Sequence, residues 1–189
     1  FIAQICMREH REIKMEEIRT VSEKIEQADM ILVGIGEKFV SGESERELED
    51  AYKKLAVFLE GKNYFVITTS VEDSVYDMGL RTDRIVRPLA EEEREPDENG
   101  TEHARPSRWD TYMKWLQGTL HKKLVILELG AGMKYPDILR FPFERMVYFN
   151  KKAELIRVHD KLYQLPAELK GRGISVPVNP VTLLTKEEI

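Results

Sequence analysis

Continuous apolar segments alternate with amphipathic segments along most of the chain. The apolar runs are rich in β-branched and aliphatic residues, which predicts strands buried on both faces. They are 30–36, 64–69, 123–129 and 153–159, with shorter candidates at 84–89 and 173–178. Other segments carry apolar side chains at spacings of three and four, which predicts helices. They are 14–28, 44–59, 107–120 and 136–149.

This alternation of strands and helices predicts an α/β fold, a parallel sheet with helices on both faces and right-handed crossovers. Ser44 and Glu47 form a capping-box pattern, which predicts a helix start at that point. We expect the helix at 136–149 to be broken near Pro142, and Pro180 to open a final short helix.

The predicted organisation is a single domain over 1–189. Residues 91–108 differ in composition, because they carry many charges, two prolines and no large apolar residue. We therefore expect a loop or a small reduced insert at 90–108, too short to form a second domain.

Composition and charge exclude several classes of function. The chain has 189 residues, 42% of them apolar, and a formal net charge of −5, which argues against broad nucleic-acid binding. It has no run of about 18 apolar residues, so no membrane-spanning helix is expected. The single cysteine, Cys6, excludes an internal disulfide and a cysteine-rich zinc site. We expect a cytoplasmic protein.

The residues that follow the predicted strands are the candidate site, because ligands bind at the carboxyl ends of strands in such sheets. They are Gly34, Gly36 and Lys38, then Ser70 and Glu72, then Gly130, Ala131 and Gly132, and finally His159. Glycines allow backbone amides to approach a phosphate closely, and Lys38 adds a cation. The alternative is structural: tight turns, helix caps and a surface histidine.

Four segments in the same order and spacing resemble the sirtuin family. GIGEKFVSG (34–42) aligns without a gap with the sirtuin pattern Gly-Ala-Gly-x-Ser-x-x-Ser-Gly, and TTSVED (68–73) lies where sirtuins have Thr-x-Asn-x-Asp. LGAGMKYPDILRFPFERM (129–146) is similar to a stretch of bacterial sirtuin relatives, and AELIRVH (153–159) to the family strand ending in Asn.

The resemblance implies a Rossmann-like domain that binds NAD or ADP-ribose. In this family nicotinamide leaves NAD, and the ADP-ribose carbon is captured by an acyl-lysine oxygen or by a protein nucleophile. The resemblance assigns Gly34 and Gly36 to the pyrophosphate and 130–132 to the adenosine side. It places His159 where the family Asn holds the adenine ribose.

The departures from the family pattern affect catalysis most. Ser70 replaces the family Asn, Glu72 replaces the Asp, and the segment 84–90 contains no histidine where the family has its general base. Loss of a positioned base costs roughly 10²–10⁴-fold in rate. The family zinc cysteines are absent, so no zinc is expected.

Three functions stay open at this point. The first is a divergent sirtuin-like protein that binds NAD or ADP-ribose and has weak or no deacylase activity. The second is an active enzyme, either an ADP-ribosyltransferase with a protein substrate or an NAD hydrolase, in which Glu72, Asp73 or His159 would serve. The third is a scaffold whose cleft is filled by Ile35, Glu37 and Phe39.

Overall fold

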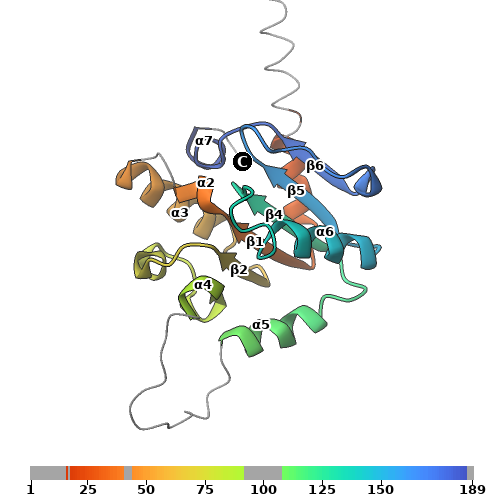
Figure 1. The fold of residues 1–189 in the computed structure, drawn as a ribbon, viewed down its shortest axis with the longest axis horizontal. Helices are drawn as coiled ribbons and strands as arrows, with labels where there is room; N and C mark the ends of the chain where they lie inside the picture. Colours follow the sequence, from red (N-terminus) through yellow and green to blue (C-terminus); the bar gives the residue numbers. More distant parts are fainter. Residues whose placement is uncertain (1–15, 17, 41–43, 92–107, 187–189) are drawn as a thin grey trace, which may run out of the picture.

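The computed structural model describes residues 16, 18–40, 44–91 and 108–186. Its centre is a six-stranded sheet with the order β3-β2-β1-β4-β5-β6, in which every neighbouring pair is parallel (Figure 1). The strands are β1 (Met30–Ile35), β2 (Tyr64–Thr68), β3 (Ile85–Val86), β4 (Leu124–Leu129), β5 (Glu154–Val158) and β6 (Gly173–Val176). The predicted α/β class is confirmed as a Rossmann-like arrangement.

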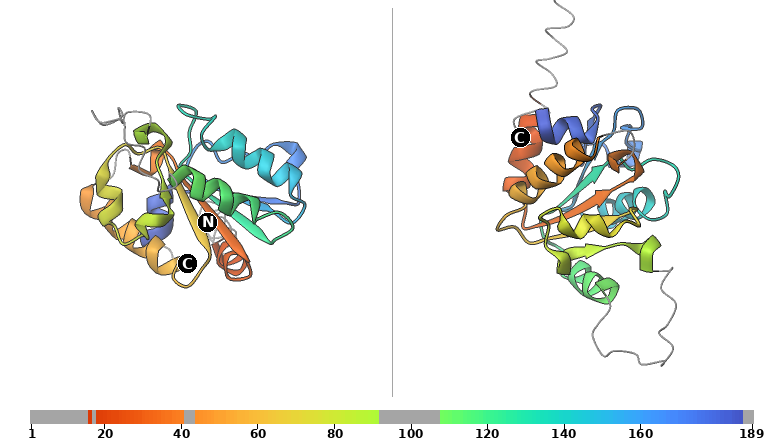
Figure 2. Two further views of the ribbon diagram at one scale, coloured as in Figure 1. Left: turned by 90° about the horizontal axis from the view of Figure 1, so that it is seen from below. Right: turned by 90° about the vertical axis from the view of Figure 1, so that its left-hand side faces the viewer.

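Helices cover both faces of the sheet, as Figure 2 shows. The first described helical segment spans 18–26. It is followed by α2 (Glu37–Val40), α3 (Glu45–Phe58), α4 (Pro88–Glu91), α5 (Arg108–Gln117), α6 (Arg140–Phe149) and α7 (Pro180–Lys186). Short 3₁₀ turns are η1 (Asp73–Asp77), η2 (Thr82–Arg84) and η3 (Ala167–Leu169).

Successive strand residues enter two different cores, because side chains alternate across a strand. Ile31, Val33 and Ile35 pack with the 18–26 helix, α3 and α7 on one face. Leu32, with neighbouring buried residues of β2 and β4, packs under α5 and α6 on the other face. This double burial explains why the strands read as continuous apolar runs.

The start of α3 agrees with its capping-box pattern. Ser44 is the N-cap, its hydroxyl accepts from the Glu47 amide, and the Glu47 carboxylate accepts from the Ser44 amide. The final helix does begin at Pro180.

One local expectation was wrong. No break occurs at Pro142, because α6 begins at Arg140 and the proline falls in the first turn, where its missing amide costs no helical hydrogen bond. The run at 84–89 contains the short strand expected there, which ends after two residues because Pro88 then opens α4. The predicted insert falls largely on 92–107, outside the described residues.

Candidate functional site

The order of the strands reverses between β1 and β4. From β1 the chain builds outward through β2 to β3, and it then returns to the other side of β1 to lay down β4, β5 and β6. In open sheets of this kind the crevice for a ligand lies at the carboxyl ends of the two strands that flank the reversal. Gly36 follows β1 directly, and the turn at 130–132 follows β4, so the topology brings them together.

The two turns are held against each other by backbone hydrogen bonds. The Gly36 amide donates to the Leu129 carbonyl at 2.9 Å, and the Lys38 amide donates to the Gly130 carbonyl at 3.0 Å. The amide of Phe39 donates to the Gly36 carbonyl at 3.1 Å. These three amides of the first turn are therefore bonded to the protein itself.

Close backbone contact explains two of the glycines. A Cβ on Gly36 would lie 2.4 Å from the Ala131 Cα, and a Cβ on Gly130 would lie 2.7 Å from the Phe39 nitrogen. Gly130 also has φ of +68°, a conformation that side chains disfavour. Both glycines allow the β1 and β4 ends to touch.

Gly34 has a different environment, inside β1. A Cβ there would lie 2.2 Å from the Phe143 ring of α6. The helix thus lies directly on the strand at this point, and packing alone accounts for this glycine.

Glu37 reaches across the reversal point. Its carboxylate accepts from the Lys134 amide at 3.1 Å, and a Cβ on Gly132 would lie 2.4 Å from the same oxygen. The carboxylate therefore occupies space beside Gly132, which places a negative charge at the carboxyl edge between β1 and β4. In contrast, Ile35 and Phe39 are buried in the core on the α3 side.

His159 follows β5 and is 5% exposed. Its Nδ1 accepts from the amides of Lys161 and Leu162, at 3.0 and 3.1 Å, so the imidazole closes the turn after the strand. Burial lowers the pKa of His159; Asp160 acts against this change, while the nearby cations Arg140 and Lys38 add to it. A neutral ring with its proton on Nε2 lets Nδ1 accept from both amides. The Asp160 carboxylate lies 2.9 Å from the same nitrogen and would pair with a protonated ring.

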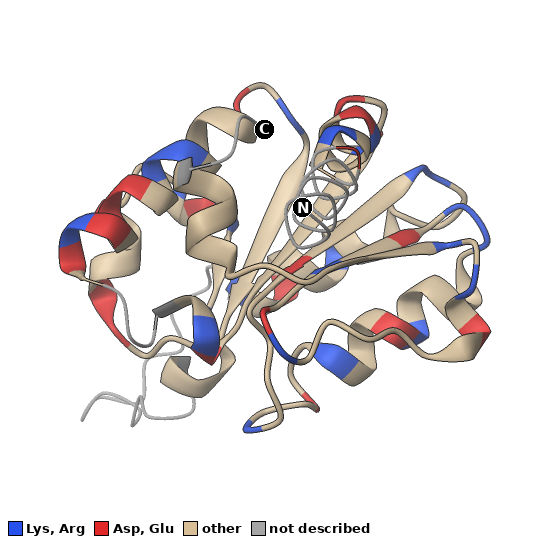
Figure 3. Cartoon of the chain, turned by 90° about the horizontal axis from the view of Figure 1, so that it is seen from above, with Lys and Arg blue, Asp and Glu red and all other residues tan. Residues whose placement is uncertain are grey.

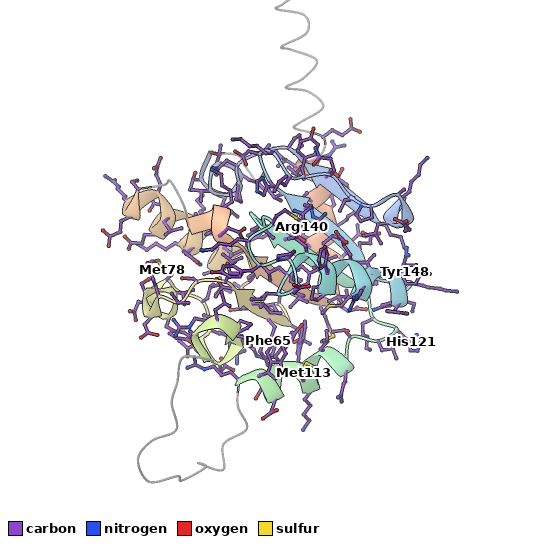
Figure 4. All side chains as sticks on the ribbon, in the orientation of Figure 1. Phe65, Met78, Met113, His121, Arg140 and Tyr148 are labelled. Atoms are coloured by element: carbon purple, nitrogen blue, oxygen red, sulfur yellow. The ribbon has the colours of Figure 1, made fainter. Side chains whose placement is uncertain are left out.

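Arg140 joins two loops at this edge of the sheet (Figure 4). Its guanidinium donates to the Ala131 carbonyl at 2.8 Å and to the Leu162 carbonyl at 3.1 Å. Glu144, four residues further along α6, pairs with Arg157 at 2.8 Å. Arg140 thus fixes the 130–132 turn relative to the turn after β5.

A buried ion pair lies directly beneath these loops. Arg157 in β5 and Glu128 in β4 are partners in the sheet register, and two nitrogens of Arg157 reach the carboxylate at 2.6 and 3.0 Å. Burial raises the pKa of Glu128, and its contact with Arg157 opposes that change. The sequence interpretation missed this pair. Its signal is an acidic residue, Glu128, near the end of one apolar run and a basic residue, Arg157, inside the next.

Ser70 and Glu72 lie at the end of β2, next to β1. The Thr69 amide donates to the Ile35 carbonyl at 3.0 Å, which ties this loop to the β1 end. Ser70 accepts from the Glu72 amide at 3.3 Å, and the Glu72 carboxylate accepts from the Ser74 hydroxyl at 3.5 Å. Both side chains thus bond within their own loop.

Arg87, which the sequence analysis did not single out, lies at the end of β3. Its side chain is 4% exposed and donates to the Asp73 carboxylate at 2.6 Å and to the Val71 carbonyl at 3.2 Å. Its guanidinium also lies 4.8 Å from the centre of the Tyr76 ring. Arg87 therefore orders the loop that carries Ser70 and Glu72.

Comparison with known proteins gives one partial match. No protein-family model matches the chain. The chain is 29% identical over 83 residues to a protein ADP-ribosyltransferase of Staphylococcus aureus, and this match covers 44% of the chain. It covers 25% of the relative, so the chain spans about a quarter of that protein's length.

The described residues contain neither a metal-binding cluster nor a membrane-spanning helix. Within the described ranges, no group of three or more His, Cys, Asp or Glu side chains is placed to hold a metal ion. None of the helices described is both long and apolar enough to cross a bilayer.

Proposed function

We propose that the carboxyl edge of the sheet, between the ends of β1 and β4, binds NAD or ADP-ribose. The observation that carries the proposal is the reversal of strand order at this point, with glycine turns on both sides. The similarity to an ADP-ribosyltransferase supports an ADP-ribosyl ligand over other nucleotides.

The residues at this edge fit such a ligand in part. Lys38 supplies a cation to the pyrophosphate. The turn at 130–132 packs against Gly36, Glu37 and Phe39, so the adenosine side would lie beyond this turn. His159 offers Nε2 to a ribose hydroxyl, and Ser70 offers a hydroxyl on the β2 side. Glu37 opposes an anion, so its carboxylate must stay on the Lys134 amide when the pyrophosphate binds.

Binding is tested by thermal unfolding with ADP-ribose and, separately, with NAD at millimolar concentration. A ligand at 100 times its Kd stabilises the folded state by about 2.7 kcal/mol, so a clear rise in Tm is expected. Lys38→Ala should reduce the shift, while Lys53→Ala on exposed α3 leaves it unchanged. Absence of a shift with either nucleotide contradicts the proposal.

We further propose that protein deacylase activity is weak or absent. Arg87 follows β3 in the segment where the resembled family has its histidine base, and an arginine does not accept a proton at neutral pH. Incubation with acyl-lysine peptide and NAD should give no more deacylated product than buffer does.

An ADP-ribosyltransferase or NAD hydrolase is the second candidate, favoured by the name of the matched relative. The transfer would break the bond between nicotinamide and ribose and pass the ribose carbon to a protein nucleophile or to water. Nicotinamide release, followed over days at high protein concentration, tests it. A rate equal to that in buffer contradicts this candidate without affecting the binding proposal.

A further inference from the structure

A hollow lies at the edge of the sheet where the strands begin, opposite the candidate site. It has a volume of about 400 Å³, within the range of small-molecule sites. Its lining comes from the first described helix and from the starts of β4 and β5: Lys24, Gln27, Ala28, Lys123, Val125, Lys152 and Glu154. None of the candidate residues of the carboxyl edge takes part in it.

The lining carries more positive than negative groups, although the chain has a net charge of −5. It has three ammonium groups and one carboxylate. The Asp29 carboxylate, which accepts from the Lys123 amide at 2.9 Å, adds a negative group beside it. Lys24 and Glu154 neutralise each other at 2.5 Å. Lys123 and Lys152 form no ion pair within the described residues, and both are exposed. Figure 3 shows blue segments on the turns at this end of the sheet.

The wall of the hollow is apolar as well as basic. Val125 is 4% exposed and belongs to the core, and Ala28 is packed against the same core. Two cations beside an apolar wall are complementary to a dianion that carries an apolar body. A phosphate monoester, largely doubly charged above about pH 6, has that chemistry.

We propose that this hollow, the amino-edge pocket, binds a small phosphate monoester, with its phosphate between Lys123 and Lys152. The body of the ester lies against Ala28 and Val125. The Lys24–Glu154 pair limits the net positive charge of the pocket and so weakens anion binding. This proposal is independent of the NAD site, because the two sites lie at opposite edges of the sheet.

The lysine turns supply a matched control. Lys122 and Lys151 are exposed neighbours of the two proposed ligands and do not line the pocket. Titration calorimetry with phenyl phosphate is expected to show binding to the unaltered chain. Lys123→Ala with Lys152→Ala should weaken it roughly tenfold or more, because charge-assisted hydrogen bonds are lost. Lys122→Ala with Lys151→Ala changes the net charge equally and should leave the affinity within about twofold.

Two further measurements separate a pocket from a diffuse positive field. Glu154→Gln should strengthen phenyl phosphate binding several-fold, and inorganic phosphate should bind more weakly than phenyl phosphate. Equal loss in both lysine double variants would overturn the proposal, as would equal affinity for the two probes or no binding at all. Failure of the ADP-ribose experiment has no bearing on these results, since neither probe contains a nucleotide.

Discussion

His159 shows how one residue can serve either a turn or a ligand. Its Nδ1 is committed to the amides of Lys161 and Leu162, as expected of a capping side chain. Its Nε2 is left to serve the ribose role that the resemblance assigns to it. The structural and ligand-binding interpretations of this residue are therefore compatible.

The burial of His159 predicts that the free energy of unfolding decreases as the pH is lowered. The pKa of His159 is lowered in the folded state, so the unfolded chain binds more protons around and below the ordinary value of about 6.5. The free energy of unfolding contributed by His159 is fully present above pH ~7 and is lost as the pH falls through the folded-state pKa. Urea unfolding of the unaltered chain should show this loss.

His159→Asn should flatten the dependence, because Asn has no proton to bind and its carbonyl can accept from one of the two amides. His121→Asn is the control, since that histidine is exposed and its φ of 67° suits asparagine. Equal slopes in the unaltered chain and in His159→Asn would show that the imidazole is not the titrating group.

Replacing one member of the Glu128–Arg157 pair should lower the free energy of unfolding more than replacing both members. Arg157→Met leaves Glu128 buried without its main partner, and breaking such a pair costs about 3–5 kcal/mol. Glu128→Leu combined with Arg157→Met removes both charges and should recover at least half of that loss. Urea unfolding measures both effects. A double variant less stable than the single one would argue against this account.

At the scale of elements, the ends of β1 and β4 and the helix α6 form one closely packed unit. Gly36 meets backbone atoms of the β4 turn, whereas Gly34 meets the side chain of Phe143. The glycine pattern in the sequence located this unit. The pattern did not show whether the turn after β1 binds a phosphate or closes on the turn after β4. The amides of Gly36 and Lys38 find their acceptors at that second turn, which lies more than 90 residues away in the sequence.

The two glycines should respond differently to the same substitution. Gly34→Ala and Gly36→Ala both introduce a clash, and overpacking costs about 1–3 kcal/mol. Adding Phe143→Leu should restore part of the stability of Gly34→Ala, because the obstructing ring is removed. The same addition should not help Gly36→Ala, whose obstruction is backbone. Thermal unfolding of the four variants tests this, and a rescue of both would contradict the assigned contacts.

At the scale of the whole molecule, the sequence predicted the sheet better than the site. Continuous apolar runs identified the strands because a doubly covered parallel sheet buries both faces of each one. The pocket at the amino edge was missed, since Lys123 and Lys152 look like ordinary solvated turn residues until the sheet brings them together. Arg87 was missed because the burial of a charged residue depends on its tertiary neighbours.

The shared sheet predicts a single cooperative unfolding transition. Each of the longer strands sends side chains into both cores, so neither core can be lost without the other. Both tryptophans, Trp109 and Trp115, lie in α5 on one face, and Trp115 packs against Phe65 of β2. Tryptophan fluorescence therefore reports the α5 face, while far-UV circular dichroism reports the whole chain, and their urea midpoints should coincide. A fluorescence midpoint at lower urea would mean that α5 detaches before the rest of the chain unfolds. In that case Trp115→Phe, in which Trp109 remains as the probe, tests whether the Trp115 contact holds α5 on the sheet.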